Sequence, residues 1–274
     1  MKAAKLVSRA LLSVKGPESL PFLQSLLSND LNQLPSAKCL YSFLLNAKGR
    51  IVSDLLVYAQ PNDEILLETD AAQIALLDRN LRLYRLRRKV DIVKRDDLNV
   101  HFVFPDLTPS NGDAFPDPRL TSKFGYRLLS GSEVPSTAEE SDYLRHRLTW
   151  GLGEGGEELA DQIALNVNGD FLNGISYDKG CYIGQELIAR THHTGIIRRR
   201  LIPFRTLDPP VTVKANSDIV SPDGKRRGKV IRAVEGVGIG VVSVEAVSNK
   251  MPLASGGHDL EFYKPDWWPA QEKA

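Results

Sequence analysis

Three apolar-rich stretches of strand length follow one another in the first quarter of the chain. They run over Cys39–Asn46, Arg50–Tyr58 and Glu64–Thr69, and the links between them, AKG and QPND, are typical of turns. Short apolar runs bounded by turn residues predict strands, and short turn-like links join neighbouring strands in antiparallel fashion. The pattern therefore predicts an antiparallel meander, preceded by a further strand over Arg9–Gly16.

Helical spacing of apolar residues appears in other segments of the chain. Pro17–Asp30 carries leucines three and four positions apart behind an early proline. Asp70–Arg88 is amphipathic, and its first residue is an aspartate placed to cap a helix. Ser136–Leu152 begins with Ser136 and Glu139 in the arrangement of a capping box. Each of these segments is predicted to form a helix.

The character of the chain changes from Leu201 onward to short strands and turns. Short strands broken by proline and glycine predict a small all-β unit, and we expect it to be barrel-like. Upstream, strands and helices are mixed without βαβ alternation, so the predicted fold class is α+β. We expect an N-terminal α+β region over residues 1–197 and a C-terminal β-barrel over residues 198–274.

The composition of the chain is that of an ordinary globular protein. Its 274 residues are 42% hydrophobic and 25% charged, with a formal net charge of +1, so bulk charge argues neither for nor against a nucleic-acid partner. Two cysteines are too few for a disulfide framework, which indicates a reducing compartment. No apolar run approaches the ~20 residues of a membrane helix, and we expect no membrane partner. The basic N-terminus is interpreted as a first strand and not as a signal peptide.

One cysteine lies in a polar segment with glycines on both sides, DKGCYIGQELIAR, over Asp178–Arg190. Asp178 is a residue type that caps helices, and the residues after the second glycine favour helix. Cys181 is therefore predicted at or just before a helix N-terminus, where free N–H groups and the helix dipole lower the pKa of a thiol. Lys179 would lower it further. Such a thiolate can act as a nucleophile or as a soft metal ligand.

A buried apolar role is the alternative for any single cysteine, and we expect it for Cys39, which lies in a hydrophobic strand pattern. The polar surroundings of Cys181 argue against that role there. His192 and His193 could supply a ligand or a base, but neighbouring helical residues point in different directions, so at most one would join Cys181. A complete zinc site is not predicted, because four-ligand sites usually contain C-x-x-C pairs.

The octapeptide KGCYIGQE, followed by ARTHHTG and RRRL, resembles the signature of the iron–sulfur cluster assembly factors of the aminomethyltransferase superfamily. The mitochondrial member of this family matures [4Fe–4S] proteins, and the glycine-cleavage T-protein shares the fold but lacks the signature. The segments VKGPESLPFLQSLLSNDL and LNAKGRIVSDLLVY resemble other parts of the family, and LYRLRRKV and PDWWP resemble its mitochondrial form. The motif residues are Lys179, Gly180, Cys181, Tyr182, Gly184, Gln185 and Glu186.

The resemblance implies a ring of interleaved α+β subdomains around a central channel, closed by the C-terminal β-barrel. It also implies that Cys181 ligates a [2Fe–2S] cluster shared with an A-type iron–sulfur carrier protein. Such clusters usually take four thiolate or imidazole ligands, so the remaining ligands would come from the partner. By the same resemblance, the protein is an assembly factor rather than a classical enzyme. Its implied location is the mitochondrial matrix, or the cytoplasm if the source is bacterial.

A folate-dependent one-carbon transferase is one alternative function. The T-protein uses paired acidic residues in the hairpin that corresponds to GRIVSDLL, where this chain has Ser53 and only Asp54. A further acidic residue is expected upstream of the cysteine segment, but Ile163–Ser176 contains no glutamate. These departures disfavour methyl transfer and leave tetrahydrofolate binding near Asp54 as an open alternative. Asp54 could equally be a solvated strand carboxylate or a turn cap.

Basic residues cluster in RLYRLRRK over Arg82–Lys89 and again at Arg198–Arg200. Such clusters usually form solvated faces or ordinary ion pairs. The functional alternative is an anion site for a folate glutamate tail, an acidic partner or RNA phosphates, with Arg190 and Arg198 as candidate contacts. An RNA-associated module is the third function considered, but the chain lacks the stacking aromatics of RNA-binding motifs, so we expect no nucleic-acid partner.

Overall fold

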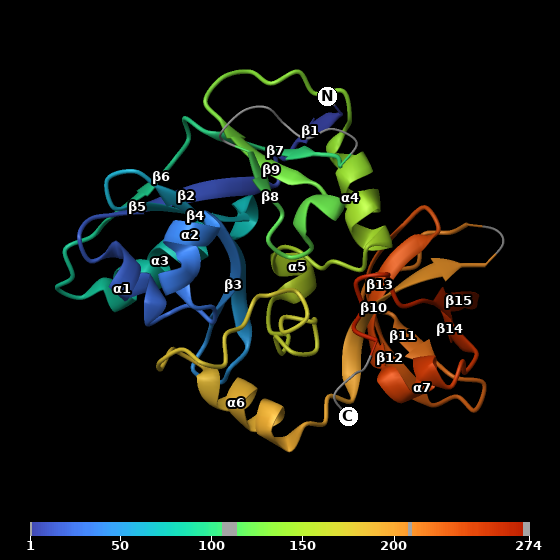
Figure 1. Cartoon of the computed structure of the whole chain (residues 1–274). Coiled ribbons are helices and arrows are strands. Elements are labelled where there is room, and N and C mark those ends of the chain that lie inside the picture. The colour runs from blue at the N-terminus through green and yellow to red at the C-terminus, as the bar shows by residue number, and fades with distance from the viewer. Residues whose placement is uncertain (1, 106–113, 208–209, 271–274) are drawn as a thin grey trace. The chain divides into compact units, whose positions relative to one another are not determined.

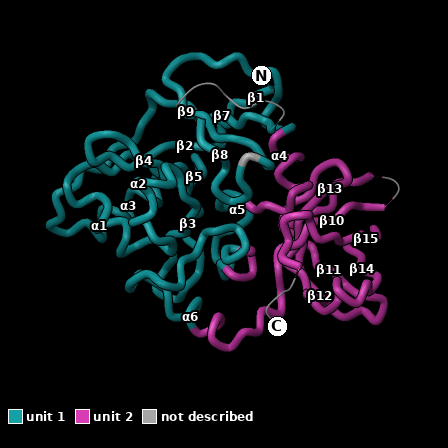
Figure 2. The backbone as a smooth tube through the Cα atoms, viewed as in Figure 1, with its two compact units in different colours: residues 1–142, 154–164, 169–189 teal, residues 143–153, 165–168, 190–274 magenta. Residues whose placement is uncertain are grey.

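The computed structural model describes residues 2–105, 114–207 and 210–270 (Figure 1). The chain forms two compact units, each assembled from separate stretches of sequence (Figure 2). Unit 1 comprises Met1–Asp142, Glu154–Ala164 and Gly169–Ala189, and unit 2 comprises Tyr143–Gly153, Leu165–Asn168 and Arg190–Ala274. The predicted domain boundary between residues 197 and 198 stays a prediction.

The larger sheet of unit 1 has the strand order β3-β4-β5-β2-β6, and neighbouring strands are antiparallel. Its strands are β2 (Arg9–Lys15), β3 (Cys39–Leu45), β4 (Ile51–Gln60), β5 (Glu64–Asp70) and β6 (Asp91–Lys94). The predicted meander of β3, β4 and β5 is confirmed. The turn between β4 and β5 places Asn62 and Asp63 at φ 60° and 56°, the left-handed backbone that matches a hairpin turn to the twist of its strands.

Helices cover one face of this sheet (Figure 1). They are α1 (Ser19–Gln24), α2 (Leu34–Ala37), α3 (Ile74–Arg85) and the short 3₁₀ turns Leu31–Gln33 and Ala71–Gln73. Leu77 and Leu81 of α3 are fully buried in the core between the layers. The helix is shorter than predicted. Asp70 caps the preceding 3₁₀ turn by accepting the N–H of Ala72 at 2.8 Å, and Leu86 ends the helix with φ 49°.

A second sheet of unit 1 has the order β1-β7-β9-β8. Its strands are β1 (Ala3–Lys5), β7 (Asn99–Val103), β8 (Ala114–Pro116) and β9 (Tyr126–Ser130), with a 3₁₀ turn at Thr121–Lys123. The side chains of Phe102, in β7, and Phe124 are fully buried, with ring centroids 5.0 Å apart. This sheet carries two of the buried arginines, Arg119 near β8 and Arg127 in β9, that are described below.

Helix α4 (Glu140–Thr149) begins later than predicted. The N–H groups of Thr137 and Ala138 both donate to the carbonyl oxygen of Ala3 at 3.0 Å, so this stretch is bonded to β1 and cannot form the first turn. The N–H of Glu139 donates to the Oδ2 atom of Asp142 at 2.9 Å. The predicted capping box is therefore wrong, because Asp142 and not Ser136 accepts the hydrogen bond at the helix start.

The strands of unit 2 close into a barrel in the order β10-β13-β12-β11-β14-β15, which confirms the predicted β unit. They are β10 (Arg199–Thr206), β11 (Asp218–Val220), β12 (Arg226–Val234), β13 (Val237–Ser243), β14 (Leu253–Ser255) and β15 (His258–Phe262), with α7 (Val244–Ser248) after β13. Leu201, Phe204 and Ile239 are fully buried. No helix within the described ranges has the length and apolarity needed to cross a membrane.

Candidate functional site

Cys181 lies in an irregular loop over residues 177–184, and the residue is exposed. The helix that follows, α6 (Gln185–Thr194), begins four residues after the cysteine. This corrects the prediction that Cys181 lies at or just before the helix start. Asp178, the predicted cap, is exposed and lies seven positions before the first helical residue. The thiol is accessible, as the polar sequence around it predicted.

Two glycines set the start of α6. Gly184 has φ 80°, and a Cβ there would lie 2.4 Å from the carbonyl oxygen of Asn46. Gly49 has φ 74°, and a Cβ there would lie 2.6 Å from Cβ of Leu187. The first turn of α6 thus lies against the turn between β3 and β4 at a distance that only glycine permits. This contact between distant residues fixes where the helix begins.

Lys179 fastens the upstream side of the loop to unit 1. Its ammonium uses its three N–H donors on three backbone carbonyl groups between the last residue of α1 and the 3₁₀ turn at Leu31. The acceptors are the carbonyl oxygens of Gln24, Leu27 and Asn29, at 2.7, 2.6 and 2.8 Å. Burial lowers the pKa of Lys179 to about 8, against the opposing effect of the Asp30 carboxylate. Lys179 therefore holds the loop in place, and its predicted effect on the Cys181 thiol stays a prediction.

Tyr182 fastens the downstream side. Its side chain is buried, and burial raises its pKa to about 12. The ammonium of Lys179 lies 5.0 Å from the centroid of the Tyr182 ring, within the range of a cation–π contact. The N–H of Tyr182 donates to Oε1 of Gln185 at 3.1 Å. Lys179 and Tyr182 are thus both held against unit 1. Gly180 and Cys181, which lie between them, are exposed to solvent.

Gly180 differs from the other motif glycine. It has no positive φ, and a Cβ added to it would meet no atom within 4 Å. Nothing in the described part of the chain therefore requires glycine at this position. The absence of a side chain leaves open space beside the exposed Cys181.

The other predicted residues lie along α6 and beyond it. Glu186 is exposed in the first turn, whereas Ile188 is buried. His192 and His193 are exposed in the last turn, with ring centroids 5.9 Å apart. Whether either joins Cys181 stays a prediction. Arg190 and Arg198 are exposed, and their predicted anion contacts also stay untested.

Within the second basic cluster, Arg200 does not have the exposed position that an anion contact needs. It is 4% exposed, and its Nη1 atom donates to the carbonyl oxygen of Leu165 at 3.0 Å. Arg200 therefore binds a loop of unit 2. The interpretation of Arg198–Arg200 as a solvated face is therefore wrong at Arg200.

No group of three or more His, Cys, Asp or Glu side chains that could hold a metal ion occurs among the residues that the structure describes. Cys39 is buried in β3, where burial raises the pKa of its thiol, and its predicted core role is confirmed. Cys181 is thus the exposed cysteine of the two.

Asp54 is fully buried, so its interpretation as a solvated strand carboxylate is wrong. Its Oδ1 atom accepts the N–H of Gly155 at 3.0 Å, just before α5 (Gly156–Leu159). Its Oδ2 atom lies 3.8 Å from Nη2 of Arg9. Burial raises the pKa of Asp54, while the guanidinium of Arg9 lowers it. One carboxylate oxygen of Asp54 is therefore hydrogen-bonded, whereas Oδ2 is buried without a hydrogen-bond partner among the described residues.

Asp54 belongs to a buried network of charges that sequence reasoning missed. Arg9 pairs with Glu68 at 2.9 Å, and Glu154 pairs with both Arg119 and Arg127, at 2.8 and 2.7 Å. The members are Arg9, Asp54, Glu68, Asp117, Arg119, Arg127 and Glu154, all of which are buried. A signal was present, because Asp54 and Glu68 each directly adjoin a run of apolar residues in their strands. Their partners come from distant segments and could not be read from that pattern.

Two parts of the chain match the models of known domain families. Residues 8–101 match the GCVT N-terminal domain, and residues 198–270 match the CAF17 C-terminal beta-barrel domain. The chain is 35% identical to the human iron-sulfur cluster assembly factor IBA57, mitochondrial, over 98% of this chain and 86% of the relative. The corresponding mouse protein is 33% identical over the same shares, and the Mycosarcoma maydis homolog is 29% identical over 98% and 85%.

The fold is also that of a solved structure. The glycine cleavage system aminomethyltransferase T from Bartonella henselae superposes with a TM-score of 0.72 at 14% identity, over 98% of this chain and 88% of the other. This confirms the predicted aminomethyltransferase-like α+β fold with its C-terminal barrel.

Proposed function

The chain belongs to the family of the IBA57 iron–sulfur cluster assembly factors, and we propose that it works by offering Cys181 as one ligand of a [2Fe–2S] cluster shared with an A-type carrier protein. The cluster is cargo on its way to [4Fe–4S] proteins. The family makes the chain an iron–sulfur cluster assembly factor, and the mitochondrial relatives support the predicted mitochondrial location.

The exposure of Cys181 carries this proposal. A thiolate is the ligand that iron–sulfur clusters prefer, and it must be reachable for a cluster to be passed between two proteins. Lys179 and Tyr182 hold the loop on either side, so the thiol is presented from a fixed backbone. A ligand fixed in this way loses little conformational freedom when a partner binds.

The need for a partner follows from the ligand count. A [2Fe–2S] cluster usually takes four protein ligands, and the described residues offer no further group gathered for metal binding. Most of the remaining ligands would therefore come from the carrier. His192 or His193 is the candidate for a second ligand from this chain. The open space at Gly180 suits this arrangement, because a partner can approach the thiol there without meeting a side chain.

The test is reconstitution of the purified chain with an A-type carrier, iron and sulfide. We expect a visible absorption spectrum with thiolate-to-iron charge-transfer bands that is lost in Cys181→Ser. Cys39→Ala is the matched control, because it removes the other thiol, and it should retain the spectrum. An unchanged spectrum in Cys181→Ser would refute ligation by this residue.

The burial of Asp54 disfavours the alternative folate function. The side chain is 0% exposed and its Oδ1 atom accepts the N–H of Gly155, although its Oδ2 atom has no hydrogen-bond partner among the described residues. Calorimetry with tetrahydrofolate tests the alternative, and heat of binding that is lost in Asp54→Asn would restore it.

A further inference from the structure

The end of α3 and the turn after it gather an unusual share of the positive charge of the chain. The segment 82–89, RLYRLRRK, contains five basic residues and no acidic one, in a chain whose formal net charge is +1. Two leucines of the same segment are exposed, Leu83 at 66% and Leu86 at 83%. We call Leu83, Arg85, Leu86, Arg87, Arg88 and Lys89 the arginine–leucine face.

Only part of this charge has a structural use. Arg82 forms an ion pair with Asp78 one turn earlier, with Nε 2.8 Å from Oδ2. Arg85 donates to the carbonyl oxygen of Val90 at 3.5 Å, and both arginines lie at the negative C-terminal end of the helix dipole. Arg88 lies 3.5 Å from Glu18, across an exposed surface. These contacts give Arg82 and Arg85 a structural role in the helix. They account less well for the basic residues of the turn that follows.

The positive charges of Arg87 and Lys89 have no partner among the described residues. Both are exposed, and neither side chain has an ion pair or hydrogen bond to another described residue. The backbone N–H of Lys89 donates to Oε2 of Glu18 at 2.7 Å, which fixes the turn and leaves the ammonium free. The turn therefore presents uncompensated positive charge to solvent.

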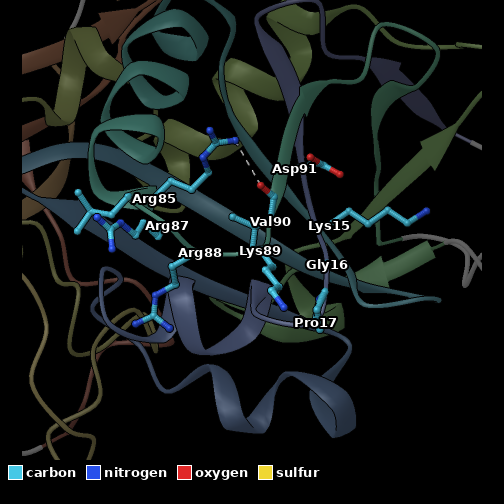
Figure 3. Close-up of a pocket in the computed structure, with 10 residues that line it drawn as sticks. Lys15, Gly16, Pro17, Arg85, Arg87, Arg88, Lys89, Val90 and Asp91 are labelled. Atoms are coloured by element: carbon cyan, nitrogen blue, oxygen red, sulfur yellow. Dashed lines mark hydrogen bonds between the residues drawn. The ribbon is translucent and has the colours of Figure 1, made fainter.

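The shape of this region favours an extended anionic surface over a small anion. It forms an open depression of about 490 Å³ whose lining includes Lys15, Arg88, Lys89 and the acidic Asp91. In Figure 3 the side chains of Arg88, Lys89 and Lys15 point in different directions, and Arg85 turns back to Val90. Cations that converge would bind one phosphate or carboxylate tightly, whereas cations that spread can meet many separate charges.

The exposed leucines indicate which kind of anionic surface this region would bind. Leu83 lies on the side of α3 away from the buried Leu77 and Leu81, and Leu76, seven residues earlier on the same helix face, is 43% exposed. Leucines that project beside lysine and arginine are typical of protein surfaces that lie in the membrane interface. RNA contacts would instead call for stacking aromatics, and Tyr84, the aromatic of this segment, packs against the core.

We propose that the arginine–leucine face docks on a membrane surface that carries anionic phospholipid, with its cations at the phosphates and Leu83 and Leu86 inserted between headgroups. Clusters of this size beside apolar side chains suit such surfaces. The contact is peripheral and needs no spanning helix, and it replaces our expectation of no membrane partner. It is independent of Cys181 and would place the assembly factor at a membrane.

Co-sedimentation of the full chain with lipid vesicles tests the proposal. The chain should bind vesicles in which about a quarter of the lipid is cardiolipin and not vesicles of phosphatidylcholine alone. Binding should fall at least about tenfold in Arg87→Glu/Arg88→Glu at low salt. The matched control is Lys214→Glu/Lys250→Glu, which changes the net charge equally at exposed barrel positions and should bind as the wild type does.

The leucines give a second, independent measurement. Leu83→Ser/Leu86→Ser keeps every charge, and we expect it to weaken vesicle binding by about tenfold through lost insertion of the two side chains. Inorganic phosphate should compete no better than sodium chloride of the same ionic strength. Three results would overturn the proposal: no binding to the anionic vesicles, equal binding by the leucine variant, or specific displacement by phosphate.

Discussion

The ammonium of Lys179 donates a hydrogen bond to the carbonyl oxygen of Leu27 at 2.6 Å, although the two residues are 152 positions apart in the chain. Lys179 stands two residues before the exposed Cys181. Because a lysine with three carbonyl acceptors resists displacement, the backbone that carries the thiol is held against unit 1. The placement of the candidate ligand thus depends on a contact between the motif and the beginning of the chain.

The burial of Lys179 predicts a pH dependence of stability. Burial lowers the pKa of Lys179 from 10.5 to about 8, so above that pH the folded chain has released a proton that the unfolded chain still holds. The free energy of unfolding should therefore rise between about pH 8 and pH 10, by on the order of 2 kcal/mol relative to Lys179→Met. Urea unfolding of both proteins across this range measures it. A difference that stays flat or falls with pH would contradict the lowered pKa of Lys179, because it would mean that the three carbonyl acceptors offset the effect of burial.

The two motif glycines should respond differently to substitution. Gly180→Leu places its side chain in open space, so the free energy of unfolding should change by less than about 1 kcal/mol. The same variant should weaken the complex with the carrier, because the added side chain occupies the approach to Cys181.

Gly184→Ala should lower the free energy of unfolding by about 2 kcal/mol or more, because the φ of Gly184 is 80° and a Cβ there would meet Asn46. Thermal unfolding and titration with the carrier separate the two effects, and equal carrier binding by Gly180→Leu would argue against this approach.

The two thiols should react at different rates. Cys181 is exposed and Cys39 is buried in β3. A thiol reagent should therefore modify one cysteine rapidly in the native chain and the other only after denaturant is added. Peptide mass spectrometry identifies the first, which we expect to be Cys181. Rapid modification of Cys39 would mean that the strand does not protect it.

The buried charge network should be sensitive to loss of its shared carboxylate. Glu154 pairs with Arg119 and Arg127, so Glu154→Gln leaves two buried guanidinium groups with less compensation. We expect a loss of about 3 kcal/mol in the free energy of unfolding. Glu235→Gln is the control, because Glu235 pairs with Arg145 at an exposed position, and its loss should stay below about 0.5 kcal/mol. Equal effects would show that the network adds nothing to stability.

The sequence predicted those elements whose stability is local. The meander of β3, β4 and β5 follows from short apolar runs separated by turn residues, and the barrel follows from short strands separated by turns. The predicted start of α4 was wrong because the N–H groups of Thr137 and Ala138 donate to the carbonyl oxygen of Ala3, which lies more than 130 positions away. No pattern within the helix itself records that contact.

The candidate site divides in the same way. The exposure of Cys181 was predicted from its polar neighbours, but the start of α6 depends on the approach of Gly184 to Asn46. The role of Lys179 depends on carbonyl groups near Leu27, and that of Asp54 on Gly155 and Arg9. Residue types indicated which groups carry chemistry, whereas their partners became visible only in the folded chain.

Native mass spectrometry of the reconstituted complex tests the central claim most directly. For the wild-type chain mixed with an A-type carrier, iron and sulfide, we expect a species whose mass equals one copy of each protein plus two iron and two sulfide ions. Cys181→Ser should give only the separate proteins or a complex without iron. A cluster-bearing complex of the same mass and abundance in Cys181→Ser would contradict the account.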